Sequence, residues 1–459
     1  MSRTILMLFV VIAAVEARVI VVPDSAPTIQ AGIDLSSNGD TVCVEPNRYY
    51  ENIDFHGRNI VLASFFIFDS SYVWISKTVI DGSRPTHPDT ASCVRIVSGE
   101  DSTCVLVGFH ITGGTGTKWQ DEHGAGLFRE GGGILIEGSS PVIRNNLFSQ
   151  NQAIDRTGVN SAGGGAIRVG DGNPRIFANV IQSNLGRYGA GIVLNYTGAV
   201  VRNNVIVANA GGEDYGGAGI WCYENFTSPK LVENNTIVDN NSVRNGGGIR
   251  VWNTTVAIRN NVIWGNHASS GAQVYAPSGA EVTYSDVEGG WAGQGNIDAD
   301  PQLMPSDYLL GLSSPCIDSG NPDPVYYDPD SAGVAKWPAR GARRNDMGAY
   351  GGPMAQRLAT GIGGAVAEEE SSTGGLALAC VPRPVGRRAQ LRFELGSAGP
   401  VLVQLVDVAG QVVRTIVDGR LSRGVHAISL DASGLAAGVY ACRLVTPSCQ
   451  ARQTLVRVR

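Results

Sequence analysis

The sequence predicts an all-β protein in which a parallel β-helix is followed by a small β-sandwich. Glycine makes up 60 of the 459 residues, about 13%, against the ~7% usual in globular chains. An asparagine-centred repeat of about 25 residues fills the middle of the chain, and short alternating apolar segments fill its last part. The content of 43% hydrophobic and 17% charged residues excludes wholesale disorder and a charged coiled coil.

The N-terminus has the pattern of a secretory signal peptide over residues 1–17. Arg3 precedes an unbroken apolar run at 5–15, and Val15 and Ala17 place small side chains at the −3 and −1 positions of a cleavage site. The run is too short to span a bilayer, which needs about 20 residues. We therefore expect an exported chain that begins near Arg18, has no transmembrane segment, and is secreted or held at the cell surface.

The repeat is visible when pairs of asparagines are aligned. In each repeat a second asparagine follows the first after five residues, and a glycine-rich segment such as GGGIL or GAGIW precedes the pair. Aliphatic or aromatic residues stand three positions before and two positions after the first asparagine, as with Ile176 and Ile181 around Asn179. The first asparagines of the five repeats are Asn146, Asn179, Asn204, Asn235 and Asn261.

A repeat of this length fits three strands of four to five residues and three turns. Leucine-rich repeats have a similar period but need leucine columns, and the glycine and asparagine content excludes helical repeats. We expect successive coils to stack as a parallel β-helix. The asparagines would form a structural ladder at one turn, because asparagine tolerates the left-handed conformation and can hydrogen-bond to its copies.

Taken together, these features resemble the secreted right-handed parallel β-helix proteins with a pectin-lyase-like fold. The resemblance covers roughly residues 19–353. VPDSAPTIQAGIDLSSNGDTVCVEPNRYYENIDFHGRNIVLAS is similar to the N-terminal capping segment of that family, and NIDADPQL, SSPCIDSGNP and RNDMGAYGGP are similar to its closing segment. The resemblance implies a right-handed β-helix over residues 18–354 and leaves the chemistry open.

A small-residue and acidic stretch at 355–375 reads as a linker, and residues 376–459 alternate as short strands of a β-sandwich. This last segment resembles the FlgD-type immunoglobulin-like domain and the C-terminal sorting domain of the type IX secretion system. The usual Pro-Asn-Pro opening appears here as Val-Pro-Arg-Pro at 381–384. The resemblance implies a sorting or attachment domain that engages export machinery.

Known catalytic motifs are missing from the sequence. There is no GxSxG, HExxH or P-loop. Polygalacturonase-like β-helices carry Asp-Asp and Gly-His-Gly blocks, whereas this chain has no Asp-Asp, and Glu122 precedes His123. Pectate-lyase-like members carry Trp-Ile-Asp-His, whereas Ser76 and Lys77 follow Trp74-Ile75 here. These departures favour a binding or structural protein over a polysaccharide lyase or glycoside hydrolase, which stays the alternative.

Strand alternation predicts an outward face that could bind a polysaccharide. If the isoleucine after each glycine run points inward, its neighbours point outward. Aromatic rings stack on sugar faces and guanidinium groups bind carboxylates or sulfates, although the same residues could simply cover a sheet. The outward column contains Leu135, Glu137, Val193 and Asn195, together with the predicted binding residues Arg168, Trp221, Tyr223, Arg250, Trp252 and Tyr275.

Loop insertions at 113–130, 152–162 and 210–217 would wall one side of this face, and the first carries Trp119 and His123. Two loop acids could act as acid and base or bind calcium, although no spacing selects a pair and solvated acids are the simpler interpretation. The candidates are Glu130, Asp155, Asp171, Asp214 and Glu224. His56, His110 and His267 stand singly and are expected to be packed or exposed residues.

No sequence motif predicts a cofactor, a metal centre or a nucleic-acid partner. The aspartates at 298–346, which include Asp323, Asp328 and Asp330, could hold a structural calcium or form turns. No CxxC motif supports zinc binding. Among the eight cysteines, Cys93 with Cys104 and Cys442 with Cys449 are close enough in sequence to form disulfides, and the register of Cys222 predicts a small core residue.

Overall fold

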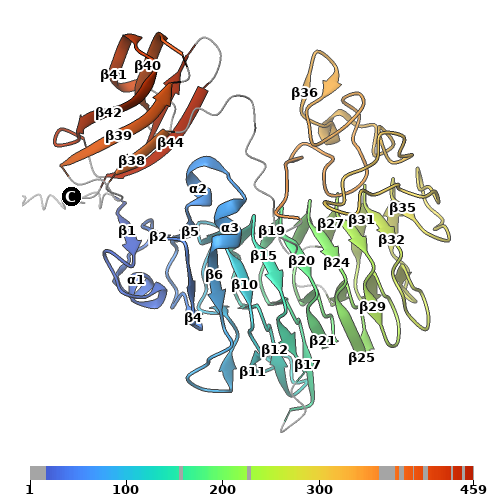
Figure 1. The fold of residues 1–459 in the computed structure, drawn as a ribbon. Coiled ribbons are helices and arrows are strands. Elements are labelled where there is room, and N and C mark those ends of the chain that lie inside the picture. Colours follow the sequence, from blue (N-terminus) through green and yellow to red (C-terminus); the bar gives the residue numbers. More distant parts are fainter. Residues whose placement is uncertain are drawn as a thin grey trace, which may run out of the picture.

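The computed structural model confirms the predicted fold class, an all-β chain with a right-handed parallel β-helix and a small β-sandwich (Figure 1). Four long sheets, which we name A to D, run along the β-helix. The structure describes residues 17–154, 159–224, 229–360, 378–381, 387–395, 397–406, 412–435, 438–446 and 450–457. The predicted signal peptide and most of the predicted linker lie outside these residues.

Between β5 and β30 each coil passes through sheets A, B, D and C in that order, while the coils before and after have no strand in sheet D. Every strand pair of sheets A, B and C is parallel. Sheet A contains β1 (Val19–Val22), β2 (Thr41–Val44), β5 (Val61–Ser64), β9 (Val105–Val107), β14 (Val142–Arg144), β19 (Arg175–Phe177), β23 (Val200–Arg202), β27 (Lys230–Glu233), β31 (Val256–Arg259) and β34 (Glu281–Thr283). Sheet B contains β3 (Asn47–Tyr49), β6 (Thr78–Asp81), β10 (His110–Thr112), β15 (Leu147–Ser149), β20 (Val180–Gln182), β24 (Val205–Val207), β28 (Thr236–Val238), β32 (Val262–Trp264) and β35 (Asp286–Val287).

Along the chain, the strands of sheets D and C come between a strand of sheet B and the next strand of sheet A. Sheet C contains β4 (Ile53–Asp54), β8 (Val94–Ile96), β13 (Ile134–Glu137), β18 (Ile167–Gly170), β22 (Ile192–Asn195), β26 (Ile220–Tyr223), β30 (Ile249–Trp252) and β33 (Val274–Tyr275). Sheet D contains β7 (Thr90–Ala91), β11 (Gly116–Gln120), β12 (Leu127–Glu130), β16 (Gln152–Ala153), β17 (Ser161–Gly163), β21 (Leu185–Tyr188), β25 (Ala210–Gly216) and β29 (Asn241–Ser242).

The expectation of three strands of four to five residues per coil is wrong. Several strands of sheets A and B have only three residues, such as β19 and β20, because a left-handed residue bends the chain directly after them. The inserted segments before the glycine runs form the additional sheet D. The coils from β5 to β30 therefore have four straight segments, and the segment in sheet D forms a wall beside sheet C.

The apolar columns of the repeat form a continuous core. Ile143, Ile176 and Val201 stack in sheet A, while Phe148, Ile181 and Ile206 stack in sheet B. All six side chains are fully buried. The glycine runs let neighbouring coils approach closely, since a Cβ on Gly219 would lie 2.3 Å from the carbonyl oxygen of Gly248.

The asparagine ladder is present as a chain of buried hydrogen bonds. The backbone N–H and the side-chain amide of Asn146 both donate to Oδ1 of Asn179, at 3.0 and 3.2 Å. The same pattern continues through Asn204 and Asn235 to Asn261. A second ladder joins the asparagines five residues later in each repeat: Asn151, Asn184, Asn209, Asn240 and Asn266.

The ladder asparagines themselves are not left-handed, which corrects that part of the prediction. The left-handed residue is the one before each of them, as at Ala178 (φ 55°) and Asn203 (φ 53°). The preceding residue makes the bend, and the ladder asparagine then satisfies the backbone groups that the bend exposes. Asn203 also donates to the carbonyl oxygens of Ala349 and Gly351, which fastens the closing segment to the coils.

Short elements lie at the start of the β-helix, between β5 and β6, and in the closing segment. Helix α1 (Ile29–Leu35) lies next to β1 and buries Ile29 and Ile33 in the core (Figure 1). Its N-terminus is capped by Thr28 and by the carboxylate of Glu51. The other short elements are α2 (Phe66–Asp69), α3 (Val73–Lys77), the 3₁₀ helix η1 (Pro324–Tyr326) and the hairpin of β36 (Asp330–Ser331) and β37 (Val334–Ala335).

The C-terminal part forms two antiparallel sheets around a core of its own. One sheet contains β38 (Leu378–Val381), β39 (Arg388–Leu395) and β42 (Gly424–Asp431). The other contains β40 (Gly399–Val406), β41 (Val412–Leu421), β43 (Gly438–Val445) and β44 (Gln450–Arg457). Leu391, Val403 and Leu444 are buried in one cluster that both sheets share, as in a sandwich.

One of the two predicted cysteine pairs, Cys93 with Cys104, is not a disulfide. Cys93 and Cys104 are free and buried in the β-helix core, because successive strands carry them inward rather than toward each other. Cys442 is buried in the core of the sandwich, and Cys449 lies outside the described residues, so that pairing stays a prediction. Cys222 is a buried core residue. No helix among the described residues has the length and apolar character needed to cross a membrane.

Candidate functional site

The outward face of sheet C carries two columns of side chains in the predicted register. One column runs through Leu135, Arg168, Val193, Trp221, Arg250 and Tyr275. The other runs through Glu137, Gly170, Asn195, Tyr223 and Trp252. Because neighbouring coils lie about 4.8 Å apart, side chains of consecutive coils touch along each column.

The exposure of this face differs from the prediction. Trp252 is 41% exposed, but Trp221 on the adjacent coil is only 6% exposed, so the expectation that both lie open on the outward face is wrong for Trp221. Sheet D causes the difference, because Tyr188 at the end of β21 and Tyr215 in β25 pack over the indole of Trp221. Arg168 is 2% exposed, so it lies beneath the surface rather than on a ligand-binding face.

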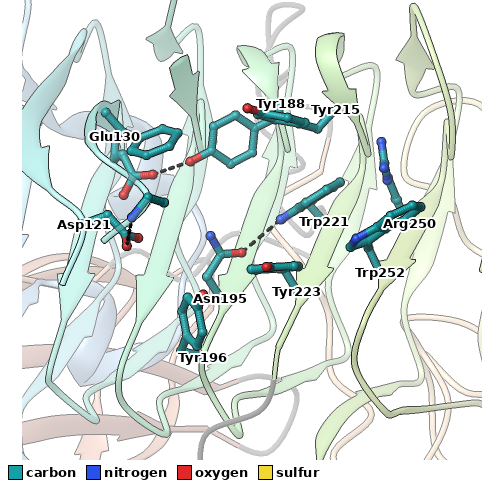
Figure 2. A pocket seen from close by; sticks show the side chains of 12 residues that line it. Asp121, Glu130, Tyr188, Asn195, Tyr196, Tyr215, Trp221, Tyr223, Arg250 and Trp252 are labelled. Atoms are coloured by element: carbon teal, nitrogen blue, oxygen red, sulfur yellow. Dashed lines mark hydrogen bonds between the residues drawn. The ribbon is translucent and has the colours of Figure 1, made fainter. Parts of the chain in front are cut away.

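A pocket of about 340 Å³ lies where sheet C meets the wall formed by sheet D (Figure 2). Its floor comes from β22, β26 and β30, and its wall comes from β12, β21, β25 and the turn at 121–126. The residues that line it are Asp121, Ala125, Phe128, Glu130, Tyr188, Asn195, Tyr196, Tyr215, Trp221, Tyr223, Arg250 and Trp252. Four of the six predicted binding residues are among them, while Arg168 and Tyr275 are not.

Aromatic rings form the middle of the pocket. Trp221 and Tyr223 point to the same side of β26 and lie nearly parallel, with ring centroids 6.2 Å apart (Figure 2). The indole N–H of Trp221 donates to Oδ1 of Asn195 at 2.9 Å. Tyr188 meets Trp221 edge to face, with centroids 6.0 Å apart. The rings are therefore fixed by one another and by a hydrogen bond.

Arg250 supplies positive charge at one end of the pocket. Its guanidinium lies 4.5 Å from the ring centroid of Trp221, 5.1 Å from that of Trp252 and 5.6 Å from that of Tyr275. Burial lowers the pKa of Arg250 to about 10, so the group stays charged at neutral pH. No carboxylate among the described residues pairs with it, and its buried Nε has no hydrogen-bond partner. The guanidinium of Arg250 is thus held by three aromatic rings, and it can still bind an anionic group of a ligand.

Acidic side chains mark the opposite end of the pocket, where they are already engaged (Figure 2). Oε1 of Glu130 accepts a hydrogen bond from the Tyr188 hydroxyl, and Oε2 lies 2.6 Å from Nε of Arg168. Oδ1 of Asp121 accepts from the backbone N–H groups of His123 and Ala125. Neither acid is placed as a free acid or base facing a ligand.

Arg168 belongs to a buried charge cluster under the pocket wall. It neutralises Glu130 and lies farther from Glu137, with 3.7 Å between Nη1 and Oε2. Burial alone would lower the pKa of Arg168, but the carboxylates of Glu130 and Glu137 raise it above its ordinary value. Burial and, more weakly, the nearby carboxylates raise the pKa of Glu137 to about 8, although Arg168 lowers it in part. Arg168 therefore supports the pocket and is not available to a ligand.

The remaining loop acids are separated. Asp214 pairs with Arg187, with 2.6 Å between its Oδ1 and Nη2, and Glu224 accepts from the side chain of Asn253. Asp171 accepts from His123. Asp155 lies outside the described residues. None of the described candidates forms a pair of acids across the pocket.

Three histidines stand apart from the pocket, as expected. His110 in β10 contacts the Ser149 hydroxyl at 2.7 Å, and burial lowers its pKa to about 4. His56 lies at the surface beside Asp34, and His267 is exposed. In the closing segment, Asp323 caps η1 and Asp330 accepts from the N–H of Gly333, as turn-forming aspartates do. Asp328 is buried and accepts from the N–H groups of Asp346 and Gly352. A calcium ion there stays a prediction.

The sequence reasoning missed the aromatic wall of the pocket. Tyr188 and Tyr215 stand directly before a glycine run, and Tyr196 directly follows β22. Tyrosine before glycine in two successive repeats was a usable signal, because the rings of Tyr188 and Tyr215 contact each other, with centroids 5.6 Å apart. Asp121 carried no such signal, since its place depends on the path of the inserted hairpin of β11 and β12.

The geometry agrees with a comparison of the chain with known families. Residues 92–263 match the family model described as right handed beta helix region. The matched range is similar in sequence to right-handed β-helices and contains every residue that lines the pocket. No curated protein matches the chain.

Proposed function

We propose that this right-handed β-helix protein is exported, attached to the cell surface, and binds a polysaccharide or cell-surface glycan in the aromatic pocket of sheet C. The observation that carries the proposal is the set of rings on successive coils around one pocket, in which Tyr215 and Trp252 are 45% and 41% exposed. Aromatic surface of this kind costs free energy when it is left in water, so it marks a binding site more often than a scaffold.

The charges of the pocket favour a glycan with an acidic substituent. Arg250 is only 7% exposed and has no acidic partner among the described residues. Leaving a buried charge unpaired is costly, and a carboxylate or sulfate of the ligand would compensate it. Asp121 and Glu130 line the other end, where neutral hydroxyl groups fit better than a second anion.

Binding is favoured over hydrolysis or elimination by the state of the pocket acids. Glycoside hydrolysis needs two carboxyl groups that flank the scissile bond. Both oxygens of Glu130 are occupied, and Asp121 holds its own turn. A lyase or hydrolase stays the second candidate that the experiment below separates from binding.

Export and attachment rest on the ends of the chain. The apolar run at 5–15 and the small residues before Arg18 support export. The C-terminal sandwich supports attachment through its likeness to sorting domains and its basic composition, with 11 arginines, no lysine and four acidic residues in 376–459.

The test uses purified full-length protein and a panel of neutral, uronate-containing and sulfated glycans. Retention on each glycan is measured together with the release of reducing ends and the ultraviolet absorbance of unsaturated products. Retention without products supports the binding function. Release of products would replace it with the enzymatic alternative, and absence of both would refute the proposal.

Trp252→Ala is the sharpest variant for this pocket, because the side chain is partly exposed and its loss leaves the core intact. We expect binding to weaken by about 1 to 3 kcal/mol, the usual cost of truncating an aromatic residue at an interface centre. Trp337→Ala is the matched control, since Trp337 is 59% exposed and does not line the pocket. Equal retention by both variants would contradict the assignment of the pocket.

Arg250→Lys tests the acidic substituent. Lysine keeps the charge but cannot form the bidentate fork or stack between two indole rings. We expect weaker binding of uronate-containing or sulfated glycans and little change for neutral ones. A uniform loss across the panel would show that Arg250 shapes the pocket without reading an anion.

A further inference from the structure

Three carboxylates lie close together beside the pocket, where the turn at 121–126 approaches the ends of strands β13 and β18. Glu122 lies on that turn, Glu137 ends β13 and Asp171 directly follows β18. One oxygen from each lies within 4.8 Å of the others. Carboxylates at such distances repel one another unless a proton or a cation lies between them.

Glu137 adds a second, independent observation. Glu137 is only 5% exposed, and its Oε2 has no hydrogen-bond partner. The nearest guanidinium nitrogen, Nη1 of Arg168, is 3.7 Å away, beyond hydrogen-bond reach, while Nε of Arg168 lies 2.6 Å from Glu130. Buried carboxylate oxygens are normally hydrogen-bonded, paired or bound to a metal. This oxygen has a place for a positively charged ligand.

The backbone leaves room for that carboxylate. Glu137 lies directly over Gly170, because a Cβ at position 170 would stand 2.2 Å from Oε1. The next residue, Asp171, has a left-handed backbone with φ 45°, which turns its carboxylate back toward Glu137. A glycine and a left-handed aspartate thus bring two acids of adjacent coils together.

His123 also contacts this cluster of three acids. Its Nε2 lies 2.9 Å from both oxygens of Asp171, and its ring stacks on Tyr196 with centroids 3.6 Å apart. Because Asp171 already engages Nε2, the donors left for an ion are carboxylate oxygens. Oxygen-only donor sets with several carboxylates suit Ca²⁺, which accepts flexible geometry and mono- or bidentate ligands.

We propose that Glu122, Glu137 and Asp171 bind a calcium ion that fastens the turn at 121–126 to the ends of β13 and β18. Among the described residues, the ion pairs of Glu130, Glu137, Asp171 and Glu122 involve only Arg168 and His123, so the local charge agrees with a divalent ion. The turn carries Asp121 and Ala125 into the pocket wall. The ion would therefore hold the wall in place without touching a ligand in the pocket.

The experiment measures cation binding by the full-length protein, without any glycan, so its outcome is separate from that of the proposed function. Calorimetric titration with Ca²⁺ is paired with terbium luminescence, in which Tyr196 beside the site acts as the sensitiser. We expect one ion per chain and a rise in the thermal unfolding temperature as Ca²⁺ is added. The absence of Ca²⁺ binding to the parent protein would overturn the proposal.

Two variants locate the ion. Glu137→Gln removes one carboxylate donor, and Asp171→Asn removes another but keeps an acceptor for His123 at a left-handed position that asparagine tolerates. Each should weaken Ca²⁺ binding by roughly tenfold or more, while Glu281→Gln, an exposed acid on β34, should leave it unchanged. A tyrosine-sensitised terbium signal that survives in both variants, or Ca²⁺ affinity equal to that of the parent, would place the ion elsewhere. Selective binding of Zn²⁺ in place of Ca²⁺ would also refute it.

Discussion

Replacing Asn204 by alanine tests the asparagine ladder at its centre. Oδ1 of Asn204 accepts from the backbone and side-chain amides of Asn179, at 2.9 and 3.1 Å. Its Nδ2 lies 3.0 Å from each of three acceptors, the carbonyl oxygens of Ile176 and Arg202 and Oδ1 of Asn235. The side chain thus makes five hydrogen bonds in a fully buried site.

The expected cost follows from these contacts. A typical hydrogen bond contributes about 1 kcal/mol net, and a buried group left without a partner costs more. Alanine would remove all five bonds and leave the N–H of Asn179 unpaired between two coils. We expect a loss of about 3 to 5 kcal/mol in the free energy of unfolding. Backbone strain contributes nothing, since the left-handed residue is Asn203 and not Asn204.

Tryptophan fluorescence during urea unfolding isolates this effect. All seven tryptophans lie between Trp74 and Trp337, so the signal reports the β-helix and not the C-terminal sandwich. Asn173→Ala is the matched control, because this exposed asparagine accepts one hydrogen bond, from the N–H of Gly198. Its expected cost is about 1 kcal/mol. If the unfolding midpoint of Asn204→Ala shifts no more than that of the control, the ladder does not stabilise the coils.

Two further predictions concern pH and the ends of the chain. Because burial lowers the pKa of His110 to about 4 from an ordinary value near 6.5, the unfolded state binds a proton first, and stability falls as pH drops from about 6.5 to 4, by about 3 kcal/mol. Urea midpoints of His110→Gln should lose this part of the pH dependence; an unchanged profile would refute it. Truncation after Gly375 should keep the fluorescence-detected unfolding transition and move the protein from the cell surface to the medium or the periplasm; loss of the transition would show that the sandwich is needed for folding.

Much of the fold could be predicted because each sequence repeat corresponds to one coil of the β-helix. The columns that contain Ile176 and Ile181 are buried, and the register of sheet C matches the alternation counted from the glycine runs. The ladder was predictable as a set of contacts, since identical side chains at a fixed period must meet. Its backbone conformation was not, because two adjacent residues such as Asn203 and Asn204 share the turn and only one is left-handed.

The site was harder to predict because the insertions do not repeat. The period gives no path for the hairpin of β11 and β12 or for β25, so the sequence did not show that Tyr188 and Tyr215 would cover Trp221. Charge pairing was hidden for the same reason. Arg168 was counted as an outward residue, and its burial follows from Glu130 on β12, which only the folded hairpin brings beside it.

Exposure along sheet C indicates where a ligand enters. Leu135, Arg168 and Val193 are nearly or fully buried on the earlier coils, whereas Trp252 is exposed on a later one. Sheet D ends at β29, which has only two residues, while sheet C continues through β30 to β33. The wall therefore falls away beside Arg250 and Trp252, and a glycan would enter there with its acidic group at the guanidinium. Changes at Trp252 should then alter binding with little effect on folding, while changes at Arg168 should first alter stability.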